Sequence, residues 1–110
     1  MQISEQTRDG ALVIQASGRL DSSSAGGLEA VLPARIQTHD KVVLNLTDVA
    51  YVSSAGLRVL LIGAKAARAG GKKLALAGLS DSVREVFDIS GFTSLFTIAP
   101  DVDGAIAALG

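Results

Sequence analysis

Cysteine is missing from this sequence of 110 residues, and histidine occurs once, at His39. Without cysteine the chain can form neither disulfide bonds nor a thiolate nucleophile, which suits the reducing cytoplasm, where we expect the protein to reside. One histidine and scattered acidic residues leave no spacing typical of a metal site. Neither the dinucleotide-binding G-x-G-x-x-G motif nor the phosphate-binding Walker A motif occurs. The sequence therefore predicts no metal and no cofactor.

Long apolar runs and an excess of one charge are also missing. The 10 basic and 11 acidic side chains give a net charge of −1, and no block of like charges offers an electrostatic contact for nucleic acid. The longest apolar run, residues 59–64, is far too short to cross a bilayer, and the amino terminus lacks the pattern of a secretory signal. We therefore expect neither nucleic-acid binding nor membrane insertion.

The chain does contain enough small aliphatic residues to build one core. Hydrophobic residues make up 48% of the sequence and aromatic residues only 4%, so the core should consist of Ala, Val, Leu and Ile side chains. A length of 110 residues is typical of one domain, and we expect a single domain spanning residues 1–110.

The first part of the chain has the pattern of a β-hairpin followed by a helix. Asp9-Gly10 is a strong signal for a type I′ turn, which needs positive φ at both central residues, and we expect Gly18 to end the second strand. Helical spacing follows over residues 22–37, where a serine can cap the helix. Pro33 and a pair of glycines predict that this helix is kinked or short.

The rest of the chain alternates strand and helix patterns. Near the start of the third helix, Ser82 and Glu85 have the spacing of a capping box, and Gly91 followed by Phe92 fits a Schellman ending. The alternation indicates an α/β fold with a mixed, mostly parallel sheet of four to five strands and about four helices. After the first helix, the expected elements are a strand over 41–49, a helix over 55–69, a strand over 72–79, a helix over 80–92, a strand over 94–99 and a helix over 101–110.

The helix expected over residues 55–69 has an apolar face and a charged face. The side chains that should face the sheet are Leu57, Leu60, Ala64 and Ala67. Arg58 and Lys65 lie on the opposite side, with Ile62 between them and Leu61 at the border of the two faces. We therefore expect Ile62 to be largely exposed. It is either one of the isolated apolar residues that are common on protein surfaces or the centre of a docking surface.

Ser53 and Ser54 stand side by side where a strand is expected to become a helix. In one interpretation both serve only as helix caps, because a serine oxygen there satisfies a free backbone N–H, worth about 1 kcal/mol. In the other, one of them carries a phosphate, because the amino end of a helix stabilises an anion. No acidic residue occupies the first turn, residues 55–58, so a phosphate of about −1.5 to −2 charges would meet little repulsion.

A catalytic serine is a third interpretation. The segment VSSAG at 52–56 partly matches the G-x-S-x-G motif of serine hydrolases, but Val52 replaces the first glycine. A nucleophilic serine also needs a base, and His39 precedes the strand that the serines follow. His39 should therefore lie at the opposite end of the sheet from the serines. We expect the protein not to be an enzyme.

Three segments together resemble the STAS domain and, more narrowly, the bacterial anti-sigma factor antagonists. They are GRLDSSSA at 18–25, LNLTDVAYVSSAGLRVLL at 44–61 and VREVFDISGF at 83–92. They occur in order and at natural spacing over nearly the whole chain. The resemblance implies a four-to-five-stranded sheet surrounded by helices, and a regulator that acts by binding.

The resemblance also implies a phosphorylation switch. In that family a serine preceded by aspartate accepts phosphate from an anti-sigma factor that is itself a serine kinase, and a metal-dependent serine phosphatase removes it. The match implies Ser54 as the acceptor, with Ser53, which replaces the usual aspartate, as the alternative. It also implies that Asp21, the acid of the family's Gly-x-Leu-Asp segment, lies near the acceptor. The implied partner-binding residues are Asp21, Ser53, Ser54, Arg58, Leu61 and Ile62.

A second role stays open within the same resemblance. Some STAS domains are never phosphorylated and act only as interaction subunits of membrane transport complexes or of other regulatory complexes. In that case Ser53 and Ser54 would serve only as helix caps.

Overall fold

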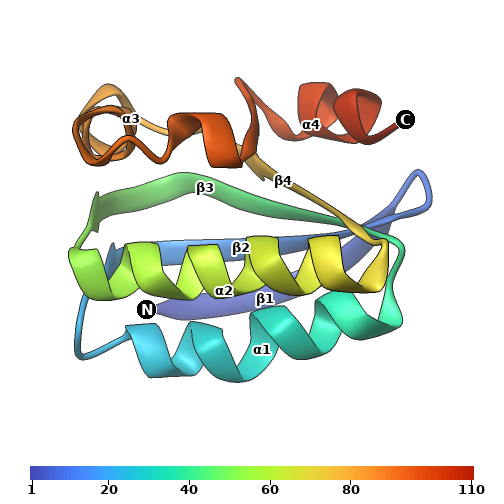
Figure 1. Ribbon diagram of the computed structural model, residues 1–110, viewed down its shortest axis with the longest axis horizontal. Coiled ribbons are helices and arrows are strands. Elements are labelled where there is room, and N and C mark those ends of the chain that lie inside the picture. Colours follow the sequence, from blue (N-terminus) through green and yellow to red (C-terminus); the bar gives the residue numbers. More distant parts are fainter.

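Five strands form one sheet in the computed structural model, which describes all 110 residues (Figure 1). They are β1 (Gln2–Arg8), β2 (Ala11–Leu20), β3 (Lys41–Val52), β4 (Lys73–Ala77) and β5 (Thr97–Ala99). The strands follow one another across the sheet in chain order. β1 pairs antiparallel with β2, and every later pair is parallel. The predicted mixed, mostly parallel sheet is confirmed.

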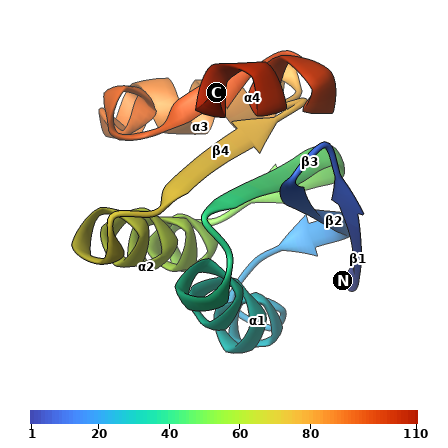
Figure 2. The same cartoon turned by 90° about the vertical axis from the view of Figure 1, so that its right-hand side faces the viewer.

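Four helices and one 3₁₀ turn accompany the sheet. They are α1 (Ala25–Thr38), α2 (Ser54–Gly70), α3 (Asp81–Ser90), η1 (Thr93–Leu95) and α4 (Val102–Leu109). α1 and α2 lie side by side on one face of the sheet, and α4 lies on the other face (Figure 2). α3 packs on β3 and shares the core of α1 and α2. No helix has both the length and the hydrophobicity that crossing a membrane requires.

Two groups of buried residues hold these layers together. The larger group lies between the sheet, α1, α2 and α3, and the smaller group lies under α4. Both consist of Leu, Val, Ile and Ala side chains, with the exception of Phe87, whose ring meets that of Phe96 edge-on at a centroid distance of 5.4 Å. No polar or charged residue is buried. Helices on both faces explain why the central strands are almost continuously apolar in sequence.

The hairpin has the predicted turn, but its second strand is longer than expected. Asp9 and Gly10 both have positive φ, 52° and 81°, as a type I′ turn requires. β2 does not end at Gly18 but continues to Leu20. Gly18 has φ 105°, and the pairing with β3 shifts directly after it. Such a bulge lets a strand continue past an irregular residue, and glycine tolerates the backbone angle.

α1 differs from its prediction in its continuity and in its amino-terminal cap, whereas its buried face is as predicted. It runs without interruption over 14 residues, although Pro33 predicted a kinked or short helix. Its buried side chains are those that the spacing predicted: Ala25, Leu28, Leu32 and Ile36. Their burial outweighs the roughly 3 kcal/mol that an internal proline costs. Ser24 holds the N-cap position but makes no capping bond, because its hydroxyl donates to the carbonyl oxygen of Arg19 at 2.6 Å.

The start of α3 and the length of β5 also correct the sequence prediction. The predicted capping box of Ser82 and Glu85 is wrong, because Ser80 is the N-cap and its hydroxyl accepts the backbone N–H of Val83 at 3.3 Å. The predicted ending is confirmed, since Gly91 has φ 75° and closes the helix in a Schellman arrangement. β5 is shorter than expected because the residues before it form η1.

Candidate partner-binding site

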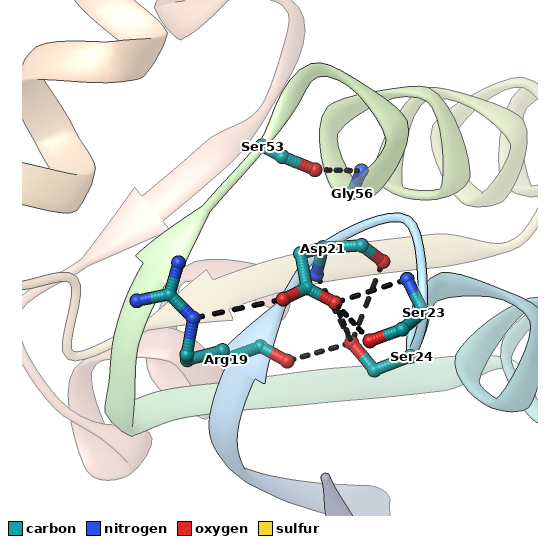
Figure 3. A network of polar contacts seen from close by, with 6 residues as sticks. All are labelled: Arg19, Asp21, Ser23, Ser24, Ser53 and Gly56. Carbon is teal, nitrogen blue, oxygen red and sulfur yellow. Dashed lines mark hydrogen bonds and ion pairs between the residues drawn. The ribbon is translucent and has the colours of Figure 1, made fainter.

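The paired serines lie where β3 passes into α2, and the two hydroxyls have different surroundings. Ser53 is the N-cap residue, with extended backbone angles of φ −89° and ψ 176°. Its half-buried hydroxyl accepts the backbone N–H of Gly56 at 3.4 Å (Figure 3). Its own N–H donates to the carbonyl oxygen of Leu20 at 2.9 Å, which ties the end of β3 to the end of β2. Ser53 is thus a structural cap.

Ser54 is the first residue of α2, and its side chain is free. It is exposed, and its hydroxyl makes no hydrogen bond within the protein. The first turn of α2 contains no acidic residue, and Arg58, one turn further along, is exposed. The positive end of the helix dipole therefore lies at this hydroxyl, and Arg58 adds a cation on the same face of the helix.

Asp21 lies in the loop that follows β2 and is held by that loop. Its carboxylate accepts the backbone N–H of Ser23 at 3.0 Å and the hydroxyl of Ser23 at 2.7 Å, and the Nε of Arg19 lies 3.6 Å away (Figure 3). The hydrogen bond from the Ser23 hydroxyl is the main cause of a lowered pKa of Asp21. No hydrogen bond joins Asp21 to Ser53 or Ser54.

A close backbone approach brings this loop to the serines. Gly56 lies so close to the end of β2 that a Cβ placed on it would stand 2.7 Å from the Cγ of Leu20 and 2.8 Å from the Leu20 carbonyl oxygen. Only glycine fits that space, because a real Cβ does not approach other atoms so closely. Leu20 is thereby in contact with both Gly56 and Ser53, and Asp21 is the next residue in the chain.

Arg19 and Tyr51 were not singled out from the sequence, but they border the same site. They are partners across β2 and β3, and the guanidinium carbon of Arg19 lies 4.4 Å from the centre of the Tyr51 ring. Tyr51 is 41% exposed, so this cation–π pair lies on the surface beside the loop of Asp21. Only the register of the two strands brings these residues together, and no local motif could have indicated it.

The face of α2 that carries the other predicted residues is only partly as expected. Leu57, Leu60 and Ala67 are buried and Ala64 is half-buried, while Arg58 and Lys65 are exposed. Ile62 is half-buried, so the expectation that it is largely exposed is wrong. Leu61 is also half-buried, and the two side chains form the apolar part of the face that follows Ser54.

His39 does not reach the serines. It stands just before β3, and the serines follow the other end of this 12-residue strand. Its Nδ1 lies 3.0 Å from the carbonyl oxygen of Arg35. The structure therefore provides no histidine base for Ser54, and it contains no group of three or more His, Cys, Asp or Glu side chains that could hold a metal ion.

Comparison with known proteins identifies relatives of the whole chain. The STAS domain family profile matches residues 2–105. BtrV of Bordetella bronchiseptica, a protein named as a candidate anti-sigma factor antagonist, is 42% identical over 109 residues, which cover 98% of this chain and 94% of that protein. The anti-sigma-B factor antagonist of Staphylococcus epidermidis is 35% identical over 94 residues, 84% of this chain and 86% of that protein.

A solved structure shares the fold. SpoIIAA, a Bacillus cell fate determinant solved in its phosphorylated form, matches with a TM-score of 0.73 and 20% identity, over 99% of this chain and 100% of that one. Its likeness concerns the fold alone, whereas the family profile and the two relatives concern the sequence. On this evidence the chain belongs to the STAS domain family, in its group of anti-sigma factor antagonists.

Proposed function

We propose that this protein binds an anti-sigma factor of the serine-kinase type when Ser54 is unmodified, and releases it when Ser54 carries a phosphate. A metal-dependent serine phosphatase would restore the binding form. The protein would thus be a cytoplasmic binding regulator and the substrate of two enzymes, rather than an enzyme.

One observation carries this proposal: the two adjacent hydroxyls are not equivalent. The hydroxyl of Ser53 is engaged with the backbone N–H of Gly56, whereas that of Ser54 is exposed and has no partner. A kinase can reach Ser54 without breaking a cap, and the cap can persist after the transfer. Modification of Ser53 would instead remove a hydrogen bond that is worth about 1 kcal/mol to the helix.

The surroundings of Ser54 also favour a phosphate. An anion at the amino end of a helix is stabilised by free N–H groups and the helix dipole, and Arg58 lies one turn away. Ser53 supports this effect, because it caps the helix without the negative charge that the family's aspartate would place next to the phosphate. The phosphorylated form of SpoIIAA gives a precedent for this modification in the same fold.

Release would follow from the cost of covering the phosphate. Ser54 shares one face of α2 with Arg58 and with the half-buried pair Leu61 and Ile62. A partner that docks on this face must remove water from a group of about −1.5 to −2 charges. A loss of about 3 kcal/mol would weaken binding by roughly two decades. No large conformational change is required.

The test compares matched variants at Ser54 and Ser4. Binding of the cognate anti-sigma factor, measured by calorimetry, should be retained by Ser54→Ala and weakened about 100-fold by Ser54→Asp. Ser4→Asp serves as the control, because it adds the same charge at an exposed serine of β1, outside this face of α2, and should leave binding within a few fold. Equal binding by Ser54→Ala and Ser54→Asp would contradict the proposal.

Phosphate mapping on protein from its native cells provides the second measurement. Trypsin should release residues 42–58 as one peptide that holds both serines. We expect phosphate on Ser54. Phosphate on Ser53 would move the switch to the other residue, and a peptide unmodified under all growth conditions would favour a permanent interaction subunit.

A further inference from the structure

A small hollow lies between α2 and η1, towards the end of α2 that is remote from Ser54. Its lining consists of Leu61, Ala64, Lys65 and Arg68 from α2 and of Leu95 from η1. Its volume of about 90 Å³ suits one aliphatic side chain, and Ala64, Arg68 and Leu95 also line a larger hollow of about 350 Å³ beside it. Leu95 is 44% exposed beside it, which leaves apolar surface in water.

The rim of this hollow is positively charged. Lys65 and Arg68 are both exposed, and neither takes part in an ion pair. α2 contains no acidic residue at all, although the chain as a whole has a net charge of −1. The hollow therefore combines an apolar floor with cations that no other part of the same molecule neutralises.

A side chain complementary to this hollow lies on α3. Ile89 is 79% exposed, more than any other large apolar side chain of the protein. Glu85 precedes it by one turn and Asp88 by one residue, and both acids are exposed. The Oδ1 of Asp88 lies 3.6 Å from the Nε of Arg84, whereas Glu85 has no ionic partner. Ile89 is thus an apolar projection flanked by carboxylates.

We propose that Ile89 of one copy of this chain occupies the hollow at Leu61 and Leu95 of a second copy, with Glu85 placed against the Lys65 and Arg68 rim. The apolar parts match in size, and the flanking charges are opposite in sign. Since the projection and the hollow are different surfaces, a reciprocal contact closes a symmetric dimer, and a one-way contact extends into longer assemblies.

This contact shares Leu61 with the surface proposed for the anti-sigma factor. Ser54 lies seven residues before Leu61, about 10 Å along the helix, and stays uncovered. A second copy and the anti-sigma factor would therefore compete for α2. The contact between copies does not itself depend on phosphorylation.

Sedimentation velocity on the full chain, over concentrations from about 10 µM to 1 mM, tests the proposal. The wild type should associate as concentration rises, and less strongly at high salt, because the charge contacts are screened. Ile89→Glu should weaken association by about 30-fold, the loss typical of a central apolar contact. Arg68→Glu should also weaken it, and adding Glu85→Arg to that variant should restore part of the loss.

Two matched controls separate this contact from general effects. Ile89→Leu keeps an apolar side chain and should associate like the wild type. Arg58→Glu reverses an α2 cation that does not line the hollow and should leave association unchanged. Circular dichroism shows whether each variant is folded. A wild type that stays monomeric throughout, association that persists in Ile89→Glu, or an absent rescue would each overturn the proposal.

Discussion

At the scale of single residues, the two serines differ because a helix N-cap needs only one side chain. The residue with extended backbone just before the first helical turn can turn its oxygen back onto the free N–H groups, and here that residue is Ser53. Serine and aspartate are both good N-caps. Replacement of the family's usual aspartate by Ser53 therefore keeps the cap and removes a negative charge next to Ser54.

Substitution of each serine by alanine should separate the two roles in stability. Ser53→Ala should lower the free energy of unfolding by about 1 kcal/mol, because it leaves the N–H of Gly56 without its partner. Ser54→Ala should change it by less than about 0.5 kcal/mol, as is usual for an exposed residue without contacts. Urea unfolding followed by circular dichroism measures both. Equal losses would mean that both hydroxyls cap the helix.

At the scale of elements, the site exists because the start of α2 can lie directly against the end of β2. Gly56 permits this approach, and the hydrogen bond from Ser53 to the carbonyl oxygen of Leu20 closes it. Since Leu20 is followed by Asp21, the distance between β2 and α2 also sets the distance between the acidic loop and Ser54. A change at Gly56 should therefore act on both stability and the site.

Two glycine-to-alanine variants test this dependence. Gly56→Ala should lower the free energy of unfolding by about 1–3 kcal/mol, because its Cβ would meet a backbone oxygen that cannot rotate away. Gly26→Ala is the control: this glycine lies in the first turn of α1, and no atom lies within 4 Å of the position that a Cβ would take. Alanine there should raise the free energy of unfolding by about 0.5–1 kcal/mol. The measurement is urea unfolding, and a harmless Gly56→Ala would contradict the close packing.

At the scale of the whole molecule, ion pairs on the surface connect elements that are distant in sequence. Glu5 on β1 accepts the Nε of Arg35 on α1 at 2.6 Å, which links the hairpin edge of the sheet to a helix beneath it. The hydrogen bond from Arg35 lowers the pKa of Glu5. The hydrogen bond from Lys72, followed by the charge of Lys72, lowers the pKa of Asp40 in the same way. The free energy of unfolding should therefore depend on pH.

The lowered pKa of Glu5 determines how the free energy of unfolding should change with pH. Its stabilising effect is complete above about pH 4.3, the ordinary pKa of glutamate in an unfolded chain, and is lost as the pH falls through the lower folded value. In Glu5→Gln the free energy of unfolding should therefore fall less steeply on acidification below that point. Glu29→Gln, at an exposed residue of α1 without an ion pair, is the control. Urea unfolding at a series of pH values measures the slopes, and identical slopes in wild type and Glu5→Gln would contradict the effect.

Much of this architecture was predictable from the sequence because its causes are local. The Asp9-Gly10 turn, the buried stripe of α1 and the glycine ending of α3 depend on backbone preferences and on periodicity within a few residues. The alternation of strands and helices then implied a mostly parallel sheet. The segments around Asp21, Ser54 and Gly91 also indicated the STAS family from the sequence alone.

The remaining features of the fold and of the site depend on contacts between segments that are distant in sequence. By sequence alone, either serine could be the cap; the pairing of β3 with β2 determines where β3 ends and therefore which serine caps α2. β2 continues past Gly18 because a bulge forms in its pairing with β3. The Arg19–Tyr51 pair and the place of Leu95 beside Leu61 likewise follow from strand register and from the packing of distant elements. Local patterns determined which elements form and which faces they bury. Which hydroxyl remains free depended on tertiary structure, because the exposure of a side chain is set by neighbours that are remote in sequence.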